Sequence, residues 1–180
     1  TRALCDWLMT KGQITEGDTC REPTANRGHM VKPLREYFSE VQASDVADYG
    51  AGFALQDYLF GTDPEMVEWT IFNPPFRLAE EFVARAIRTS RIGVAAFVRS
   101  AFLEGVGRYE RLYSENPPSD VLQFSERVVL HKGKLAPKGS TATAYCWLVW
   151  GAFRPRTQFH FIAPCRKELE RAEDYLGDQG

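Results

Sequence analysis

Hydrophobic positions along this chain follow two periods, one typical of strands and one typical of helices. Short runs rich in β-branched and aromatic residues predict strands at 19–22, 41–45, 68–72, 92–98, 121–124, 144–150 and 158–162. Apolar residues at helical spacing predict helices over 1–11, 28–38, 77–89, 107–114 and 165–176. The run at 92–98 is almost continuously apolar, which is typical of a strand buried on both faces of a sheet.

The order of these elements predicts the fold class. Strands alternate with helices, which favours an α/β fold with a mostly parallel sheet and helices on both faces. The final two strands have no clear helix between them, so we expect an antiparallel hairpin at one edge. The 180 residues are 44% hydrophobic, enough for one sizeable core. We expect one domain over 1–163, with 164–180 as its polar C-terminal helix or tail.

Composition narrows the function classes. The formal net charge of -2 gives no general attraction to nucleic acid, so any polyanion contact must be local. The four cysteines are scattered without zinc-site or disulfide-framework spacing, and we interpret them as free thiols in a reducing cytoplasm. No run reaches the ~18 apolar residues of a membrane span, and no secretory signal is present. We expect a cytoplasmic protein without a metal site. Since the chain opens at Thr1 inside a predicted helix, we also expect that residues precede it.

The most informative segment is Asn73-Pro74-Pro75-Phe76, which follows an apolar run. Proline fixes φ and cannot continue a central ladder, so the strand must end here. Asn73 therefore lies at the carboxyl tip of a strand, where open α/β sheets bind ligands. Its side-chain oxygen and the Pro74 carbonyl are two acceptors beside an aromatic ring, a site for a planar group that carries an amine. An ordinary strand-ending turn is the alternative interpretation.

This tetrapeptide resembles the Asn/Asp-Pro-Pro-Tyr/Phe motif of S-adenosylmethionine-dependent amino methyltransferases, above all the DNA N6-adenine enzymes. The resemblance implies the class I methyltransferase fold and S-adenosylmethionine as cofactor. By this resemblance, Asn73, Pro74, Pro75 and Phe76 form the catalytic motif. Asn73 and the Pro74 carbonyl would accept hydrogen bonds from the reacting amine, and Phe76 would stack on the base. Because adenine N6 is inaccessible in a duplex, the base must flip out.

The segment 21–28 resembles the cofactor loop of the same family, usually acidic-Pro-x-x-Gly-x-Gly. Glu22 and Pro23 match this pattern, with Thr24 next, and Gly28 matches the last glycine. Asn26 replaces the first glycine, and Asn is the non-glycine residue that best tolerates positive φ. By resemblance, Glu22 would face the methionine amino group of the cofactor.

Two acidic positions complete the expected cofactor site. Asp45 ends a strand 23 positions after Glu22, which fits a carboxylate that binds ribose hydroxyls, and Asp48 is a second candidate. Asp57-Tyr58 resembles the family motif whose carboxylate binds the cofactor's adenine amine. The motif order is that of the gamma-type enzymes, and the resemblance spans about residues 1–150, most like small phage or prophage DNA enzymes.

Two groups of basic residues are candidates for phosphate contacts. The first follows the motif and is interleaved with Glu80 and Glu81, so we favour a solvated helix face for Arg77, Arg85, Arg88 and Arg91. The second is less balanced by acid, and we assign it to DNA binding: Lys132, Lys134 and Lys138, with Arg154 and Arg156 beyond. The resemblance assigns no second stacking aromatic, because Phe124 lies before the expected position.

Four alternatives stay open. A protein glutamine amide is a similar planar acceptor, and a nucleobase in RNA or a free small molecule could also present such a group. A non-catalytic cofactor-binding partner subunit would explain the missing loop glycine. The chain leaves little room for a target-recognition region. We therefore expect specificity to be relaxed, or to be supplied by the 130–140 loop, by a homodimer or by a partner chain.

Overall fold

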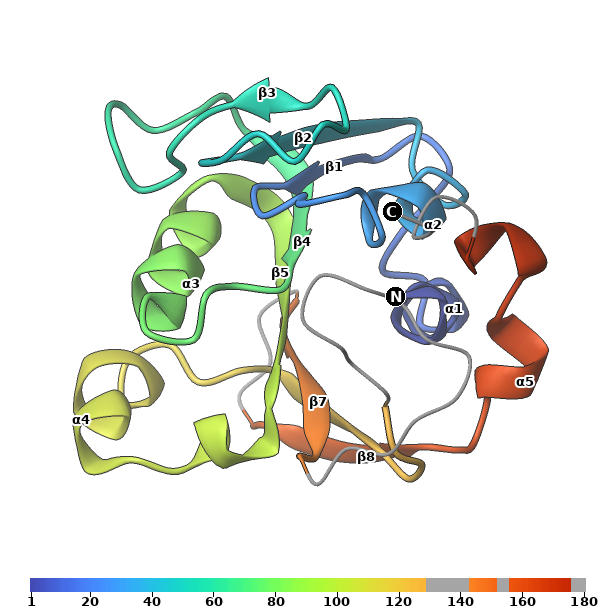
Figure 1. Ribbon diagram of the computed structural model, residues 1–180. Helices are drawn as coiled ribbons and strands as arrows, with labels where there is room; N and C mark the ends of the chain where they lie inside the picture. The colour runs from blue at the N-terminus through green and yellow to red at the C-terminus, as the bar shows by residue number, and fades with distance from the viewer. Residues whose placement is uncertain (129–142, 152–155, 176–180) are drawn as a thin grey trace.

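The computed structural model describes residues 1–128, 143–151 and 156–175, which form an α/β fold around one eight-stranded sheet (Figure 1). The strand order is β3-β2-β1-β4-β5-β7-β6-β8. The strands are β1 (Thr19–Glu22), β2 (Glu40–Asp45), β3 (Ala54–Leu55), β4 (Val67–Phe72), β5 (Ser90–Arg99), β6 (Asp120–Phe124), β7 (Tyr145–Trp150) and β8 (Gln158–Ile162).

The sheet is mostly parallel, as predicted. Every pairing from β3 through β5 is parallel, whereas β7 runs antiparallel to both of its neighbours, β5 and β6. The last strand, β8, pairs in parallel with β6 at the sheet edge, so the final two strands of the chain are not direct neighbours. The antiparallel pairs are therefore β5–β7 and β7–β6, which lie inside the sheet rather than at its edge.

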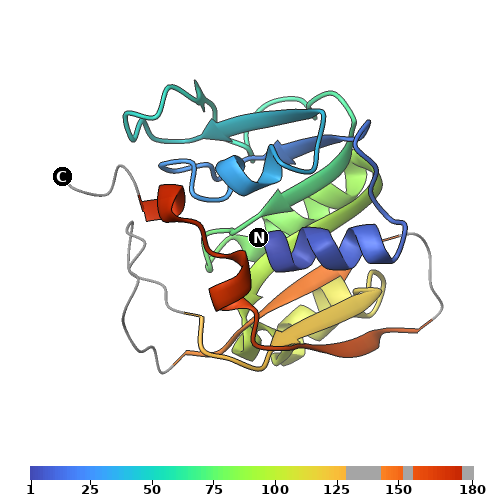
Figure 2. The same cartoon turned by 90° about the vertical axis from the view of Figure 1, so that its right-hand side faces the viewer.

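Helical segments cover both faces of the sheet (Figures 1 and 2). One face carries α1 (Arg2–Thr10), α2 (Val31–Leu34), α5 (Arg166–Leu169) and the 3-10 turn η3 (Ala172–Tyr175). The other carries α3 (Ala79–Arg88), α4 (Val106–Arg108) and the π-helical turn η2 (Tyr109–Tyr113), and η1 (Ser100–Leu103) follows β5.

The two faces are packed by alternate residues of the same strands. On β5, Ala95 and Phe97 join the core under α1, whereas Val94, Ala96 and Val98 join the core under α3. Successive side chains of a strand point to opposite faces, so a continuous apolar run buries both. This explains the near-continuous apolar pattern of this strand.

Three predicted helices are shorter or more irregular than their periodicity suggests. The segment 28–38 contains only the four-residue α2 and turns, and 107–114 combines α4 with a π-helical turn. The polar C-terminal segment is interrupted at Glu170, whose backbone is extended, and Leu176 lies outside the described residues. The two-residue β3 was not predicted, because a strand of this length has no measurable period.

The neighbouring parallel strands β2, β1 and β4 have their carboxyl ends side by side, at Asp45, Glu22 and Phe72. These ends are where the sequence places its candidate site. Within the described ranges, no helix has the length and apolar character needed to cross a membrane.

Candidate functional site

A cavity of about 730 Å³ lies at the carboxyl ends of these strands. Eleven of the residues that sequence analysis selected line it: Glu22, Pro23, Thr24, Asn26, Asp45, Asp57, Tyr58, Asn73, Pro74, Pro75 and Phe76. Gly28 is not part of the lining but shapes the loop that is. Lys132, Lys134 and Lys138 lie outside the described residues. The predicted cofactor residues and the predicted acceptor residues therefore share one cavity.

The loop after β1 is held in a glycine-like conformation at two positions. Asn26 has a φ of 47°, the positive φ that the sequence analysis predicted this residue to tolerate. Gly28 has a φ of 84°, and a Cβ there would lie 2.9 Å from the ring of Phe53. The loop is also tied to β2, since the Ala25 amide donates to the Ser44 carbonyl at 2.9 Å. Asn26 thus adopts the positive φ that glycine adopts most readily.

Glu22 is a buried carboxyl group at the floor of the cavity, with 1% of its surface exposed. Its Oε1 accepts hydrogen bonds from the Thr24 amide and hydroxyl, at 2.9 and 2.6 Å. Its Oε2 has no hydrogen-bond partner among the described residues. Burial raises the pKa of Glu22 to about 8, and nearby Asp45 adds to this rise. A cationic group in the cavity could donate a hydrogen bond to Oε2. Its positive charge would also stabilise the ionised form of the Glu22 carboxyl group.

Asp45 bridges the two cofactor segments. Its Oδ2 accepts from the Asn26 amide at 2.9 Å, and its Oδ1 accepts from the Ala47 amide at 3.1 Å. Its carboxylate is half-buried and lines the cavity, so it can both hold the loop and meet a ligand hydroxyl. Asp48 is absent from the lining of this cavity and instead caps the Gly50 amide at 2.7 Å. The geometry thus favours Asp45 of the two candidates.

Asp57 and Tyr58 lie differently although they are neighbours. Asp57 is exposed, lines the cavity and accepts from the Leu59 amide at 2.9 Å. Tyr58 is buried and its hydroxyl lies 3.2 Å from the Thr89 hydroxyl, behind the cavity wall. Its ring packs against Phe82, with 5.2 Å between centroids. Tyr58 is therefore mainly a packing residue of the wall.

The Asn73-Pro74-Pro75-Phe76 segment leaves two acceptors unused. The Pro75 carbonyl accepts from the Leu78 amide at 2.9 Å, which turns the chain into α3. The Asn73 side chain is exposed at the end of β4, and among the described residues neither it nor the Pro74 carbonyl has a hydrogen-bond partner. Phe76 is 45% exposed and lines the same cavity. These atoms are available to a ligand amine.

One wall of the cavity is aromatic and was not predicted from the sequence. Phe97, Phe124 and Trp147 line it from three neighbouring strands, β5, β6 and β7. The Phe97 ring centroid lies 5.0 Å from that of Trp147 and 6.2 Å from that of Phe124. Because β7 inserts between β5 and β6, these residues meet only once the strand order is known. Phe124 lines the cavity although it lies before the position at which the resemblance places a second stacking aromatic.

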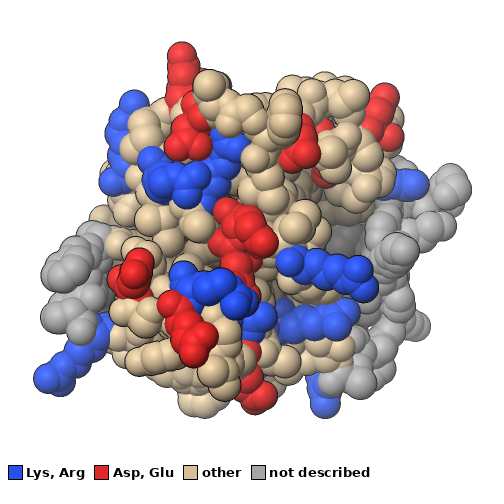
Figure 3. Space-filling model, turned by 90° about the vertical axis from the view of Figure 1, so that its left-hand side faces the viewer, with Lys and Arg blue, Asp and Glu red and all other residues tan. Residues whose placement is uncertain are grey.

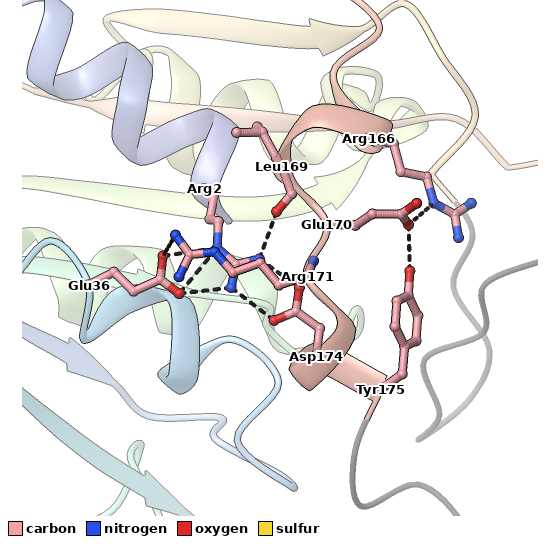
Figure 4. Close-up of polar contacts among 8 residues, drawn as sticks. All are labelled: Arg2, Glu36, Arg166, Leu169, Glu170, Arg171, Asp174 and Tyr175. Carbon is pink, nitrogen blue, oxygen red and sulfur yellow. Dashed lines mark hydrogen bonds and ion pairs between the residues drawn. The ribbon is translucent and has the colours of Figure 1, made fainter.

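The C-terminal segment forms a second wall of the cavity that the sequence did not predict. Figure 4 shows the polar contacts that hold this segment. Arg2, at the start of α1, donates to Glu36 through Nε and Nη2 at 2.9 and 2.7 Å. It also donates to Asp174 at 2.7 and 2.9 Å and to the Leu169 carbonyl at 2.9 Å. The hydrogen bonds from Arg2 hold the pKa of Asp174 below its usual value. Six residues of this segment line the cavity: Cys165, Arg166, Leu169, Glu170, Asp174 and Tyr175.

Most arginines of the α3 side are neutralised by acidic neighbours, and Figure 3 shows the two charges interspersed over the centre of this face. The exposed Arg88, Arg91 and Arg111 and the half-buried Arg108 form ion pairs with Asp63, Glu68 and Glu80, at 2.9 to 3.5 Å. Arg85 is buried rather than on the solvated face that we had predicted, and its Nε lies 3.1 Å from Asp63. The described residues contain no group of three or more His, Cys, Asp or Glu side chains that could hold a metal ion.

Comparison with solved structures identifies the fold. A type I restriction-modification methyltransferase subunit from Streptococcus thermophilus aligns with a TM-score of 0.63 and 11% identity, over 97% of this chain and 48% of that one. The chain has the class I methyltransferase fold. A protein from Listeria monocytogenes described as a class I S-adenosylmethionine-dependent methyltransferase aligns with a TM-score of 0.62 and 9% identity, covering 91% of this chain and 64% of that one.

A ribosomal RNA methylase from Streptococcus thermophilus shares the class I fold as well. It aligns with a TM-score of 0.54 and 13% identity, over 84% of this chain and 95% of that one. This chain thus spans about half the length of the restriction-modification subunit and most of the length of the RNA methylase. No protein-family model and no curated protein matches the sequence.

Proposed function

We propose that this protein transfers a methyl group from S-adenosylmethionine to the exocyclic N6 of adenine in DNA. The observation that carries the proposal is the convergence of the 22–28 loop, Asp45 and Asn73-Pro74-Pro75-Phe76 in one cavity of about 730 Å³. A pocket of this size accommodates a cofactor and part of a second molecule.

The residues present suit S-adenosylmethionine. The free Oε2 of Glu22 would accept from the methionine ammonium, and Asp45 would accept from the ribose hydroxyls. Asp57 would accept from the adenine amine of the cofactor. When bound, the cofactor supplies an electrophilic methyl group on a sulfonium, so the reaction needs neither a metal nor a covalent enzyme intermediate.

The remaining task of the protein is to orient and activate a poor nucleophile. The lone pair of an aromatic amine is delocalised into its ring. Hydrogen bonds from that amine to the Asn73 side chain and to the Pro74 carbonyl would localise the pair and stabilise the positive charge that develops. Phe76 would stack on the flipped base and hold it in line with the methyl group.

RNA is the second candidate substrate, because the fold is shared with a ribosomal RNA methylase. A protein glutamine amide would use the same two acceptors. These acceptors bind any planar amine or amide. The substrate class is therefore decided by contacts between the surface around the cavity and the rest of the substrate molecule.

The first experiment supplies tritiated S-adenosylmethionine with unmethylated DNA, RNA and a protein extract in parallel, followed by digestion and separation. Label in N6-methyladenine from DNA is the expected result. Label in RNA or in glutamine would move the assignment to that substrate. Cofactor binding without label in any acceptor would favour a non-catalytic partner subunit.

Asn73→Ala should reduce methyl transfer at least about 100-fold, because it removes one of the two acceptors aimed at the amine. Cofactor affinity, measured by calorimetry, should stay unchanged. The chain offers a matched control in Asn116→Ala, since Asn116-Pro117-Pro118 is a second Asn-Pro-Pro sequence whose residues do not line the cavity. Full activity of Asn73→Ala would show that the tetrapeptide is only a turn.

A further inference from the structure

Two arginines near the cavity differ from the others on their side of the sheet. Of the seven arginines between residues 77 and 111, five have acidic partners, at distances of 2.9 to 3.5 Å. Arg77 and Arg99 are both exposed, and neither makes an ion pair within the described part of the chain. Glu81, four residues after Arg77, does not pair with it, and Glu80 is already bound to Arg108 and Arg111. The positive charges of Arg77 and Arg99 are therefore not neutralised locally.

Both arginines flank Phe76 of the candidate acceptor site. Arg77 follows Phe76 in the chain, and Arg99 ends β5, beside the β4 strand that leads into the motif. The guanidinium carbon of Arg99 lies 4.2 Å from the centroid of the Phe76 ring, a cation–π contact. Phe76 lines the cavity, so the guanidinium of Arg99 lies on a ring of the cavity wall, and Arg77 is the exposed residue that follows this ring in the chain.

A stacked guanidinium still offers its N–H groups, because these lie in its plane while the aromatic ring covers one face. The paired N–H groups of a guanidinium match the oxygens of a phosphate group, and this holds for both Arg77 and Arg99. The protein has a formal net charge of -2, so its overall field does not attract a polyanion. Local contacts of this kind must supply the attraction.

We propose that Arg77 and Arg99 bind the backbone phosphates of a DNA strand on either side of the nucleotide that enters the cavity. The proposal rests on the function proposed above and specifies how its substrate is held. Arg99 has a second effect: it fixes the Phe76 ring on which the base would stack. A glutamine side chain carries no flanking phosphates and would make no use of this pair.

The test measures binding of a fluorescent DNA duplex, and of an RNA of the same sequence, by anisotropy between about 50 and 200 mM salt. S-adenosylhomocysteine is present throughout. Arg77→Gln and Arg99→Gln should each lower the slope of log affinity against log salt by about 1, and the double variant by about 2. Arg99→Lys, which keeps the charge, should restore most of the slope. Arg88→Gln and Arg91→Gln are matched controls, since both are exposed but ion-paired, and should leave it unchanged.

Several outcomes would overturn the proposal: an unchanged slope in the double variant, an equal fall in the controls, or no duplex binding by the wild type. A slope that falls with RNA alone would overturn the assignment to DNA. Adenine methylation with an unchanged slope would refute the phosphate contacts and leave the proposed function standing. A fallen slope without methylation of any nucleic acid would refute the function and leave the phosphate contacts standing.

Discussion

At the scale of single residues, Glu22 of the candidate site is buried, and ionising its carboxyl group in the ligand-free fold costs free energy. Burial raises the pKa of this carboxyl group from 4.5 to about 8, so between these values the folded protein holds a proton that the unfolded chain has released. The stability contributed by this proton is fully present below pH 4.5 and is lost as pH rises through about 8. A bound ammonium group would reverse the penalty by pairing with the ionised form.

Glu22→Gln should therefore stabilise the ligand-free protein at alkaline pH and weaken S-adenosylmethionine binding. Glutamine keeps an oxygen for the Thr24 contacts but cannot ionise. The free energy of unfolding of the wild type should fall between pH 5 and 9, by up to about 4 kcal/mol, and that of the variant should stay flatter. Urea unfolding at several pH values measures this difference.

Glu16→Gln is the control for Glu22→Gln, because it makes the same chemical change at an exposed residue that does not line the cavity. Parallel profiles for wild type and Glu22→Gln would mean that Glu22 is already ionised in the ligand-free fold. Cofactor affinity, measured by calorimetry, separates the two roles, since only a ligand-facing carboxylate lowers affinity when it is replaced.

At the scale of elements, the β1–α2 loop depends on backbone conformation more than on its side chains. Gly28→Ala should lower the free energy of unfolding by about 1–3 kcal/mol, because it imposes positive φ on alanine and places a methyl group against Phe53. The same change should weaken cofactor binding by displacing the loop. Denaturant unfolding and calorimetry measure the two effects.

Asn26→Gly is the matched control for the loop. Its φ of 47° suits glycine, and within the described part of the chain the only side-chain hydrogen bond lost is the one that Asn26 Oδ1 accepts from the Arg27 amide. We expect cofactor affinity to be retained. If Asn26→Gly weakened binding as much as Gly28→Ala, the Asn26 side chain itself would have to contact the ligand.

The elements also show what the sequence could predict. Apolar runs placed seven strands and the turn at Pro74, because these features depend on local patterns. The aromatic wall could not be predicted, since Phe97, Phe124 and Trp147 converge only when β7 inserts between β5 and β6. Helical periodicity overestimated 28–38, where turns around α2 bury the same apolar residues.

At the scale of the whole molecule, the two ends of the described chain meet beside the cavity. Arg2 and Asp174 are 172 positions apart and form a contact that no local pattern could indicate. The Arg2 side chain is 9% exposed and serves two carboxylates and a carbonyl oxygen at once. This cluster links α1, the segment after α2 and the C-terminal wall of the cavity (Figure 4).

Arg2→Met should release that wall while the sheet stays folded. Methionine leaves Glu36, Asp174 and the Leu169 carbonyl without their shared donor, a loss that costs about 3 kcal/mol or more for a mostly buried ion pair. Hydrogen exchange should accelerate at 165–175 and stay slow in β4 and β5. Cofactor affinity should fall as well, because six residues of this segment line the cavity.

Arg171→Met is the matched control for the Arg2 cluster. Arg171 also binds Glu36, at 3.0 Å, but its side chain is 50% exposed, and exposed pairs of this kind contribute about 1 kcal/mol at most. Equal exchange at 165–175 in both variants would mean that apolar packing, rather than Arg2, holds the wall. Faster exchange throughout the sheet of Arg2→Met would mean that the cluster supports the entire fold, and that the C-terminal wall has no separate stability.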